Sequence, residues 1–154
     1  MELKAAAVDT LKRVRWNVVF GLLVVLVLVV FLLLGNPMEP KYQGDGEMKM
    51  RSWLEPNTVG LSDDSTAWVE LMNLGDDEYN LSLRMSAKSR ELSFKSTGEL
   101  AVQKSIIIGP GESRNIPFEI DVDAEYAGSY GIDIQVVYDK KEITSEMYLT
   151  VKDS

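Results

Sequence analysis

The 154-residue sequence contains no cysteine and no histidine. Without thiols there are no disulfide bonds and no thiolate nucleophiles, and without imidazole there is no histidine general base and no Cys/His zinc site. Basic residues are also scarce, with 16 lysines and arginines against 24 aspartates and glutamates, giving a formal net charge of −8. Nucleic-acid surfaces need clustered basic side chains, so we expect no nucleic-acid partner. We likewise expect no enzymatic activity, no cofactor and no small-molecule substrate.

One long apolar run lies near the N-terminus, at residues 18–34, with the sequence VVFGLLVVLVLVVFLLL. At 1.5 Å per residue, about 17 helical residues span roughly 25 Å. With interfacial flanks, segment 16–35 reaches the ~20 residues that cross a hydrocarbon core. We therefore predict a transmembrane helix over 16–35 that acts as an uncleaved signal anchor. A buried soluble helix, a cleaved secretory signal and a prepilin leader are the alternatives.

The flanking charges predict the orientation of this helix. Four lysines and arginines lie within residues 1–15, whereas only two lie within 36–50. Basic flanks stay in the cytoplasm, so we predict a cytoplasmic segment 1–15 and an extracytoplasmic C-terminal part. The protein would then be a single-pass membrane protein with the lipid bilayer as one partner. Residues 36–47, rich in proline and glycine, are predicted to form a linker.

Beyond residue 47, apolar and polar residues alternate with a period of two between clusters of turn residues. This pattern predicts seven or eight strands, near 48–53, 66–73, 79–85, 91–95, 102–108, 113–120, 130–138 and 143–151. That many short strands at this spacing indicate an all-β fold, an immunoglobulin-like antiparallel β-sandwich over residues 48–154. The loop before strand 130–138 also predicts a tyrosine corner, in which the Tyr130 hydroxyl bonds back to the loop backbone.

Three turn motifs resemble those of a known group of domains. They are the strand end Trp68-Val69-Glu70-Leu71-Met72-Asn73-Leu74-Gly75 with Tyr79-Asn80-Leu81-Ser82-Leu83, the turn Ile108-Gly109-Pro110-Gly111-Glu112-Ser113 and the corner Ala127-Gly128-Ser129-Tyr130. In this order they resemble the CARDB and NEW3-like immunoglobulin-like domains of archaeal and bacterial cell-surface proteins, over roughly residues 58–152. A membrane helix followed by one such sandwich is also similar to the archaellum stator subunits, which bind the surface layer. Turn motifs imply a fold more than a function.

An acidic run, Asp121, Asp123 and Glu125, precedes the predicted tyrosine corner. Alternate side chains of an extended segment point the same way, so these three carboxylates are candidate ligands for a hard cation such as calcium. Acidic residues near turns are more commonly solvated, and the glycine of an EF-hand loop is missing. We therefore predict no metal site, with these three residues as the candidates if one exists.

Asn80 is a candidate glycosylation site. It begins the acceptor triplet Asn80-Leu81-Ser82, and it falls on the polar face of a strand that is predicted to lie outside the cytoplasm. The alternative is a chance occurrence, because the triplet is common.

Trp68 and Met72 are predicted on the outward face of strand 66–73, since the small and aliphatic residues between them take the inward face. Trp53 belongs to a preceding strand whose register the sequence leaves open. Aromatic and methionine side chains on an exposed sheet face often mark a partner surface, so these three residues form the candidate binding surface. The alternatives are a covered face or a register shifted by one residue, which would exchange the two faces.

These observations predict a membrane-anchored extracytoplasmic module that binds another envelope protein, either in the surface layer or in a membrane assembly. From residue 36 onward there are 12 basic and 22 acidic residues, which favours a basic or cation-bridged partner. The alternatives are a carbohydrate-binding module and an accessory subunit of a membrane transport or secretion complex.

Overall fold

The structure, a computed structural model, describes residues 20, 23–26, 40–44 and 46–153. The chain divides into two units, residues 1–39 and 40–154, which are considered separately. The predicted cytoplasmic segment and most of the predicted anchor lie outside the described residues. Within the described part, no helix is both long enough and apolar enough to span a membrane. The anchor and its orientation therefore stay predictions.

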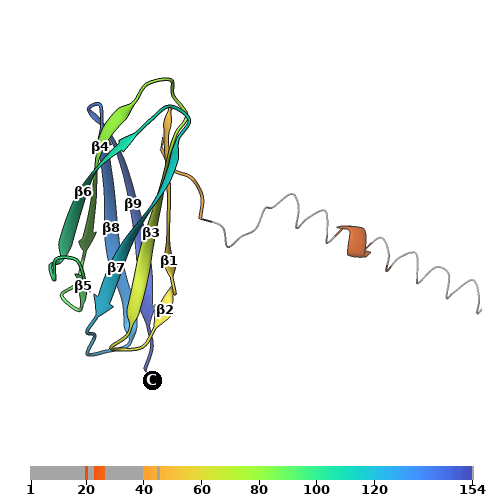
Figure 1. Cartoon of the computed structure of the whole chain (residues 1–154). Coiled ribbons are helices and arrows are strands. Elements are labelled where there is room, and N and C mark those ends of the chain that lie inside the picture. The colour runs from red at the N-terminus through yellow and green to blue at the C-terminus, as the bar shows by residue number, and fades with distance from the viewer. Residues whose placement is uncertain (1–19, 21–22, 27–39, 45, 154) are drawn as a thin grey trace, which may run out of the picture. The chain divides into compact units, whose positions relative to one another are not determined.

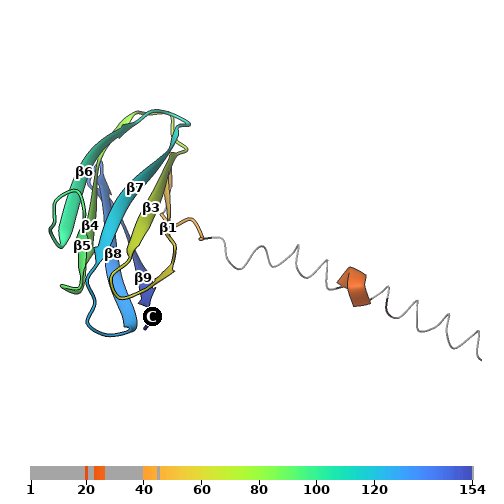
Figure 2. The same cartoon turned by 60° about the horizontal axis from the view of Figure 1, so that its bottom comes forward.

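Residues 48–151 form two sheets that face each other, with β3 and β7 in one layer and β8 and β9 in the other (Figures 1 and 2). The strands are β1 (Met48–Glu55), β2 (Thr58–Val59), β3 (Asp64–Asn73), β4 (Tyr79–Ala87), β5 (Leu92–Phe94), β6 (Ala101–Ile108), β7 (Ser113–Val122), β8 (Gly128–Tyr138) and β9 (Lys141–Val151). One sheet has the order β1-β3-β7-β5 and the other β2-β9-β8-β4-β6. The predicted all-β sandwich is confirmed.

The strand count is higher than predicted. All eight predicted strands are present with ends that move by at most two residues, and the described part of the chain holds nine strands rather than seven or eight. The additional strand is β2, which pairs in parallel with the end of β9 over only two residues. An alternation pattern cannot identify so short a strand, because its pairing depends on a residue pair far along the chain.

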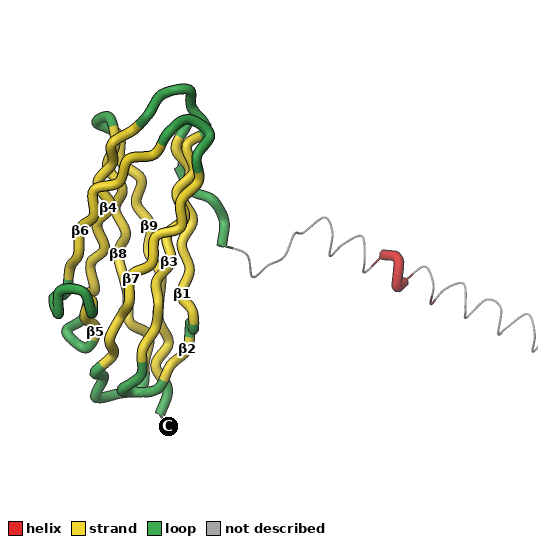
Figure 3. The backbone as a smooth tube through the Cα atoms, in the orientation of Figure 1, coloured by secondary structure: helices red, strands yellow, loops and turns green. Residues whose placement is uncertain are grey.

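Figure 3 shows the strands of the two sheets side by side in two layers. The period-two alternation places one face of the strands in the core between them. In β7, for example, Ile116, Phe118 and Ile120 are buried while the residues between them are exposed. The largest fully buried side chains are Phe94, Met48, Met50, Leu71, Leu81, Leu83, Met85, Leu92, Ile108, Ile120, Ile132 and Ile134. They come from both sheets, so hydrophobic packing joins the two layers without a disulfide.

Part of the predicted linker 36–47 is packed on the sandwich. The backbone of Gln43 pairs with that of Met50 in β1 through N···O hydrogen bonds of 2.6 and 2.9 Å. The carbonyl of Glu47 accepts a hydrogen bond from the backbone N–H of Leu74 at 2.6 Å. The glycine and proline content of this segment predicts that it is unstructured. The free edge of β1, however, offers backbone N–H and C=O groups with which the backbone of the segment forms hydrogen bonds. The folded part therefore begins several residues before Met48.

Asn73 joins two loops at one end of the sandwich. Its fully buried side-chain amide donates to the carbonyls of Asp77 at 2.7 Å and Gly109 at 3.0 Å. Its side-chain oxygen accepts from the backbone N–H of Gly75 at 2.9 Å, and its own N–H donates to the carbonyl of Glu112 at 2.9 Å. Two of the three turn motifs are thus a single hydrogen-bonded unit, although they lie more than thirty residues apart.

Replacing Asn73 by alanine is expected to lower the free energy of unfolding by about 2–4 kcal/mol, because the buried carbonyls and the Gly75 N–H lose their partners. The measurement is urea denaturation of the full chain in detergent micelles, with unfolding monitored by tryptophan fluorescence. Asn115→Ala, at an exposed position of β7, is the control and should change stability by less than about 0.5 kcal/mol. Equal losses in the two variants would contradict the structural role of Asn73.

Candidate binding surface

The three residues of the predicted binding surface lie together on the outward face of the four-stranded sheet. In the β1–β3 pairing, Trp53 is directly opposite Trp68, and Met72 follows on the same face of β3. On the other side of β3, Pro117 of β7 is opposite Trp68. The β3 residues that alternate with these outward side chains are fully buried. The sequence left the register of the strand that contains Trp53 open. In the structure, this register makes Trp53 and Trp68 direct cross-strand neighbours.

The two tryptophan rings are stacked. Their centroids are 6.2 Å apart with an interplanar angle of 13°, and both residues are half-buried. The guanidinium of Arg51 lies 4.9 Å from the centroid of the Tyr42 ring and 5.6 Å from that of the Trp53 ring. Stacking and cation–π contacts of this kind fix the orientation of large aromatic side chains. We call this surface the tryptophan face, and it comprises Tyr42, Arg51, Trp53, Trp68, Glu70, Met72 and Pro117.

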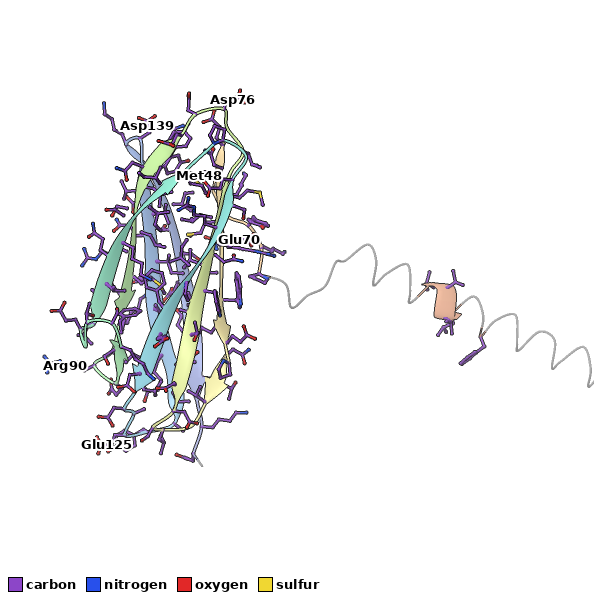
Figure 4. The ribbon with its side chains drawn as sticks, viewed as in Figure 1. Met48, Glu70, Asp76, Arg90, Glu125 and Asp139 are labelled. Carbon is purple, nitrogen blue, oxygen red and sulfur yellow. The ribbon has the colours of Figure 1, made fainter. Side chains whose placement is uncertain are left out.

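Glu70, which is labelled in Figure 4, belongs to the tryptophan face and lies two residues from Trp68 along β3. Only 8% of it is exposed. Its carboxylate forms an ion pair with Arg51 and accepts a hydrogen bond from the Ser113 hydroxyl at 3.0 Å. Burial raises the pKa of the Glu70 carboxyl. Hydrogen bonds from Arg51, Ser113 and Tyr42 lower this pKa by more than burial raises it, so the net pKa is below its ordinary value. Burial and the hydrogen bond to Glu70 raise the pKa of the Tyr42 hydroxyl.

Sequence reasoning missed Arg51, Glu70 and Tyr42. The first two occupy the same face as the tryptophans under period-two alternation, which is the signal that could have found them. Tyr42 carries no such signal, because it lies in the segment that was predicted to be a linker. Its place on this face depends on the pairing of residue 43 with β1.

The outward face of the five-stranded sheet is different in character. Arg84, Gln135 and Thr144 form one polar cross-strand row on β4, β8 and β9. Asn80, the candidate glycosylation site, is exposed on the same face of β4, and the Ser82 hydroxyl of its triplet accepts a hydrogen bond from the Gln103 side chain at 2.8 Å. The asparagine is thus accessible at the surface of the fold.

Tyr130 lies at the start of β8, next to the loop that follows β7. Its hydroxyl donates a hydrogen bond of 2.6 Å to the backbone carbonyl of Tyr126. Its ring is half-buried and packs against the core. This is the bond that a tyrosine corner makes, and it ties the β7–β8 loop to the sandwich.

The structure does not bring the acidic candidates together. Asp121 lies in β7 opposite Asp64, whereas Asp123 and Glu125 follow the end of that strand, so alternation no longer aligns them. The carboxylate of Glu125 accepts a hydrogen bond from the Tyr126 hydroxyl at 3.0 Å, at the end of the sandwich opposite Asp139 (Figure 4). Across residues 40–44 and 46–153, no three acidic side chains are grouped as metal ligands would be.

No protein-family model matches the sequence, and no characterised protein matches it significantly. Solved structures do show a similar fold. The chain aligns with Escherichia coli α2-macroglobulin, from domain MG7 to its C-terminus, with a TM-score of 0.54 and 16% identity, covering 71% of this chain and 17% of that one. With a FixG-related protein from Vibrio parahaemolyticus the TM-score is 0.50 and the identity 16%, covering 70% and 99%.

A CARDB domain from Pyrococcus furiosus, solved with two metal ions, aligns at a TM-score of 0.47 with 17% identity, covering 73% of this chain and all of that domain. At identities this low, the neighbours with TM-scores of 0.50 and above show the fold alone, a β-sandwich. The chain spans less than a fifth of the macroglobulin chain that it matches. The similarity to archaellum stator subunits stays a prediction.

The lowered pKa of Glu70 predicts a dependence of stability on pH. A depressed carboxyl pKa contributes stability above the unfolded-state pKa, and this contribution is lost as the pH falls through the folded-state pKa. The wild type should therefore exceed Glu70→Gln in free energy of unfolding by about 1–3 kcal/mol near neutral pH, with the difference shrinking below pH 4.5. The measurement is urea denaturation of both proteins from pH 7 to pH 3.

The matched control is Glu78→Gln, at an exposed loop position. Its free energy of unfolding should follow that of the wild type at every pH. A difference between wild type and Glu70→Gln that grows on acidification would contradict the assigned pKa direction.

Proposed function

We propose that the chain is a non-enzymatic, single-pass membrane-anchored module whose immunoglobulin-like sandwich lies outside the cytoplasm. In this proposal it binds another envelope protein, in the surface layer or in a membrane assembly, through the tryptophan face. The observation that carries the proposal is the grouping of Trp53, Trp68 and Met72 on one outward sheet face.

The composition of the tryptophan face supports a role in protein binding. Tryptophan, tyrosine, methionine and arginine are the residue types enriched in the cores of protein interfaces. The stacked rings and the Arg51–Glu70 pair hold these side chains in place before any partner arrives, so binding would lose little side-chain entropy. The outward face of the other sheet carries the polar row and three exposed apolar residues, Ile107, Val137 and Tyr148, but no stacked aromatic pair within the described residues.

The apolar run at 18–34 and the excess of basic residues before it support the membrane anchor. A tether of this kind confines the sandwich to a thin layer next to the membrane. Confinement raises the effective concentration of a partner in the same envelope, so a contact of modest affinity is sufficient. The acidic excess from residue 36 onward disfavours anionic lipid as the ligand of the sandwich.

A carbohydrate-binding module is the second candidate. The stacking of Trp53 and Trp68 favours it, because adjacent aromatic rings on a flat sheet can pack against the apolar faces of sugar rings. Binding to a glycan array that is lost in Trp68→Ala, without any co-purifying protein, would favour this function over protein binding.

Trp68→Ala is expected to reduce partner binding at least tenfold, since a central interface tryptophan typically contributes 2 kcal/mol or more. The measurement is the yield of proteins that co-purify with the full chain from its own membranes in mild detergent. Gln135→Ala, on the outward face of the other sheet, is the control and should leave the yield unchanged. Near-UV circular dichroism verifies that both variants are folded. Equal yields from the two variants would overturn the proposed role of the tryptophan face.

The proposed topology is tested with single cysteines, because the chain has none of its own. A cysteine at Ser154 should react with a membrane-impermeant thiol reagent on intact cells, since it would lie outside. A cysteine at Ala6 should react only after lysis. The opposite labelling pattern would contradict the orientation.

A further inference from the structure

We propose that the tryptophan face binds an extended, arginine-bearing segment of its partner, in which two successive arginines pair with Glu55 and Glu119 in the row beside Trp53 and Trp68. This inference rests on the proposed function, because it names the chemistry of the partner at the same surface. It follows from an acidic row beside the tryptophans, a cation already held on this face, and the spacing of the two glutamates.

The acidic row lies next to the row that contains both tryptophans. The registers of β1, β3 and β7 align Glu55, Thr66 and Glu119 side by side, two residues along each strand from the tryptophan row. Both glutamates are exposed, and among the described residues neither belongs to an ion pair. The Lys95 ammonium interacts electrostatically with Glu119, but its ion-pair partner is Asp64. With strands about 4.8 Å apart, the two glutamates are roughly 10 Å apart and about 7 Å from the aromatic row.

Arg51 shows how this surface holds a guanidinium. It lies over the rings of Tyr42 and Trp53 and forms an ion pair with Glu70. Trp68 offers a similar setting one strand further in, with Glu55 and Glu119 in the next row. Glu70, the neighbouring outward residue of β3, already pairs with Arg51, and the Lys95 ammonium near Glu119 pairs with Asp64. Neither Glu55 nor Glu119 forms an ion pair within the described part of the chain, so both carboxylates can accept a guanidinium from a partner.

Arginine fits this setting better than lysine. Its planar guanidinium stacks on aromatic rings and binds a carboxylate through two parallel hydrogen bonds, whereas an ammonium group is a compact and strongly hydrated charge. The acidic excess of the sandwich also attracts a basic segment over longer distances.

The separation of the glutamates indicates the conformation of the bound segment. In a polyproline II helix, side chains three residues apart point the same way and are separated by about 9.3 Å. This spacing matches the roughly 10 Å between Glu55 and Glu119 across two strand spacings. A segment with the pattern Arg-x-x-Arg, lying across β1, β3 and β7, would therefore place one arginine at each glutamate.

The test is an NMR titration of the full chain in non-ionic detergent micelles, following the indole N–H signals of Trp53 and Trp68. Trp16, the third tryptophan, is the internal reference. The probe is the capped peptide Pro-Pro-Arg-Pro-Pro-Arg-Pro-Pro. Two control peptides match it in length: one has its arginines adjacent, and one has citrulline at both arginine positions.

We expect saturable shifts of the Trp53 and Trp68 signals with the probe, binding at least fivefold weaker for adjacent arginines, and no binding for citrulline. The double variant Glu55→Gln/Glu119→Gln should bind the probe at least tenfold more weakly. The matched control, Asp139→Asn/Glu142→Gln, removes the same number of exposed charges elsewhere and should change the affinity less than twofold. Equal weakening in both double variants would show attraction by net charge alone and overturn the inference.

Co-purification separates failure of this inference from failure of the proposed function. If Trp68→Ala loses the native partner while Glu55→Gln/Glu119→Gln retains it, the tryptophan face binds a partner of other chemistry and the inference fails. If Trp68→Ala retains the partner, the proposed function itself fails. Shifts of the same indole signals by a neutral oligosaccharide, or on raising the concentration of the chain itself, with none from the peptide, would also overturn the inference.

Discussion

The register of β3 determines which side chains of the four-stranded sheet reach the core and which reach solvent. This strand is paired on both sides, with β1 and with β7, so its alternation is fixed by two neighbours at once. A shift of one residue would bury Trp68 and Met72 and expose the aliphatic residues between them. Asn73 reinforces this register, because its buried amide holds the end of β3 to the loops beside it. The tryptophan face therefore exists only because this pairing is fixed.

Two of the outer strands, β1 and β6, carry features that protect part of their edges. At β1, the backbone of Gln43 occupies part of the edge. At β6, the inward-facing side chain of Lys104 replaces an apolar residue, donates a hydrogen bond to the carbonyl of Pro117 at 2.9 Å, and lies 4.2 Å from the centroid of the Phe118 ring. An inward-pointing charge is one of the devices by which edge strands avoid pairing with another chain. Addition of a partner strand at these two edges is thus disfavoured.

Local patterns in the sequence were sufficient for much of the fold. The alternation of apolar and polar residues located eight strands. It also placed Trp68 and Met72 on the outward face, because successive side chains of a strand point to opposite faces of the sheet. The hydroxyl of Tyr130 bonds to the loop backbone as the motif before β8 predicted. Turn and strand signals of this kind lie within about ten residues, so tertiary context is not needed to recognise them.

Features that depend on residues far apart in the chain were not predictable in this way. The Arg51–Glu70 pair requires the β1–β3 register, and the pairing of Gln43 with Met50 requires a free sheet edge. In the β8–β9 turn, Asp139 and Lys140 have φ values of 40° and 61°. Turns with two positive φ values usually have the sequence Asn-Gly or Asp-Gly, so the sequence Asp-Lys does not predict this turn. The side chains of Asp121, Asp123 and Glu125 are not aligned for the converse reason, since the strand that would align them ends at Val122.

The central claim is that the tryptophan face is the surface that meets a partner. It is tested most directly by site-specific photo-crosslinking in living cells, with benzoylphenylalanine at Met72 in one variant and at Gln135 in another. The account predicts a crosslink to an envelope protein from position 72 and none from position 135. A crosslink from position 135 alone would contradict it.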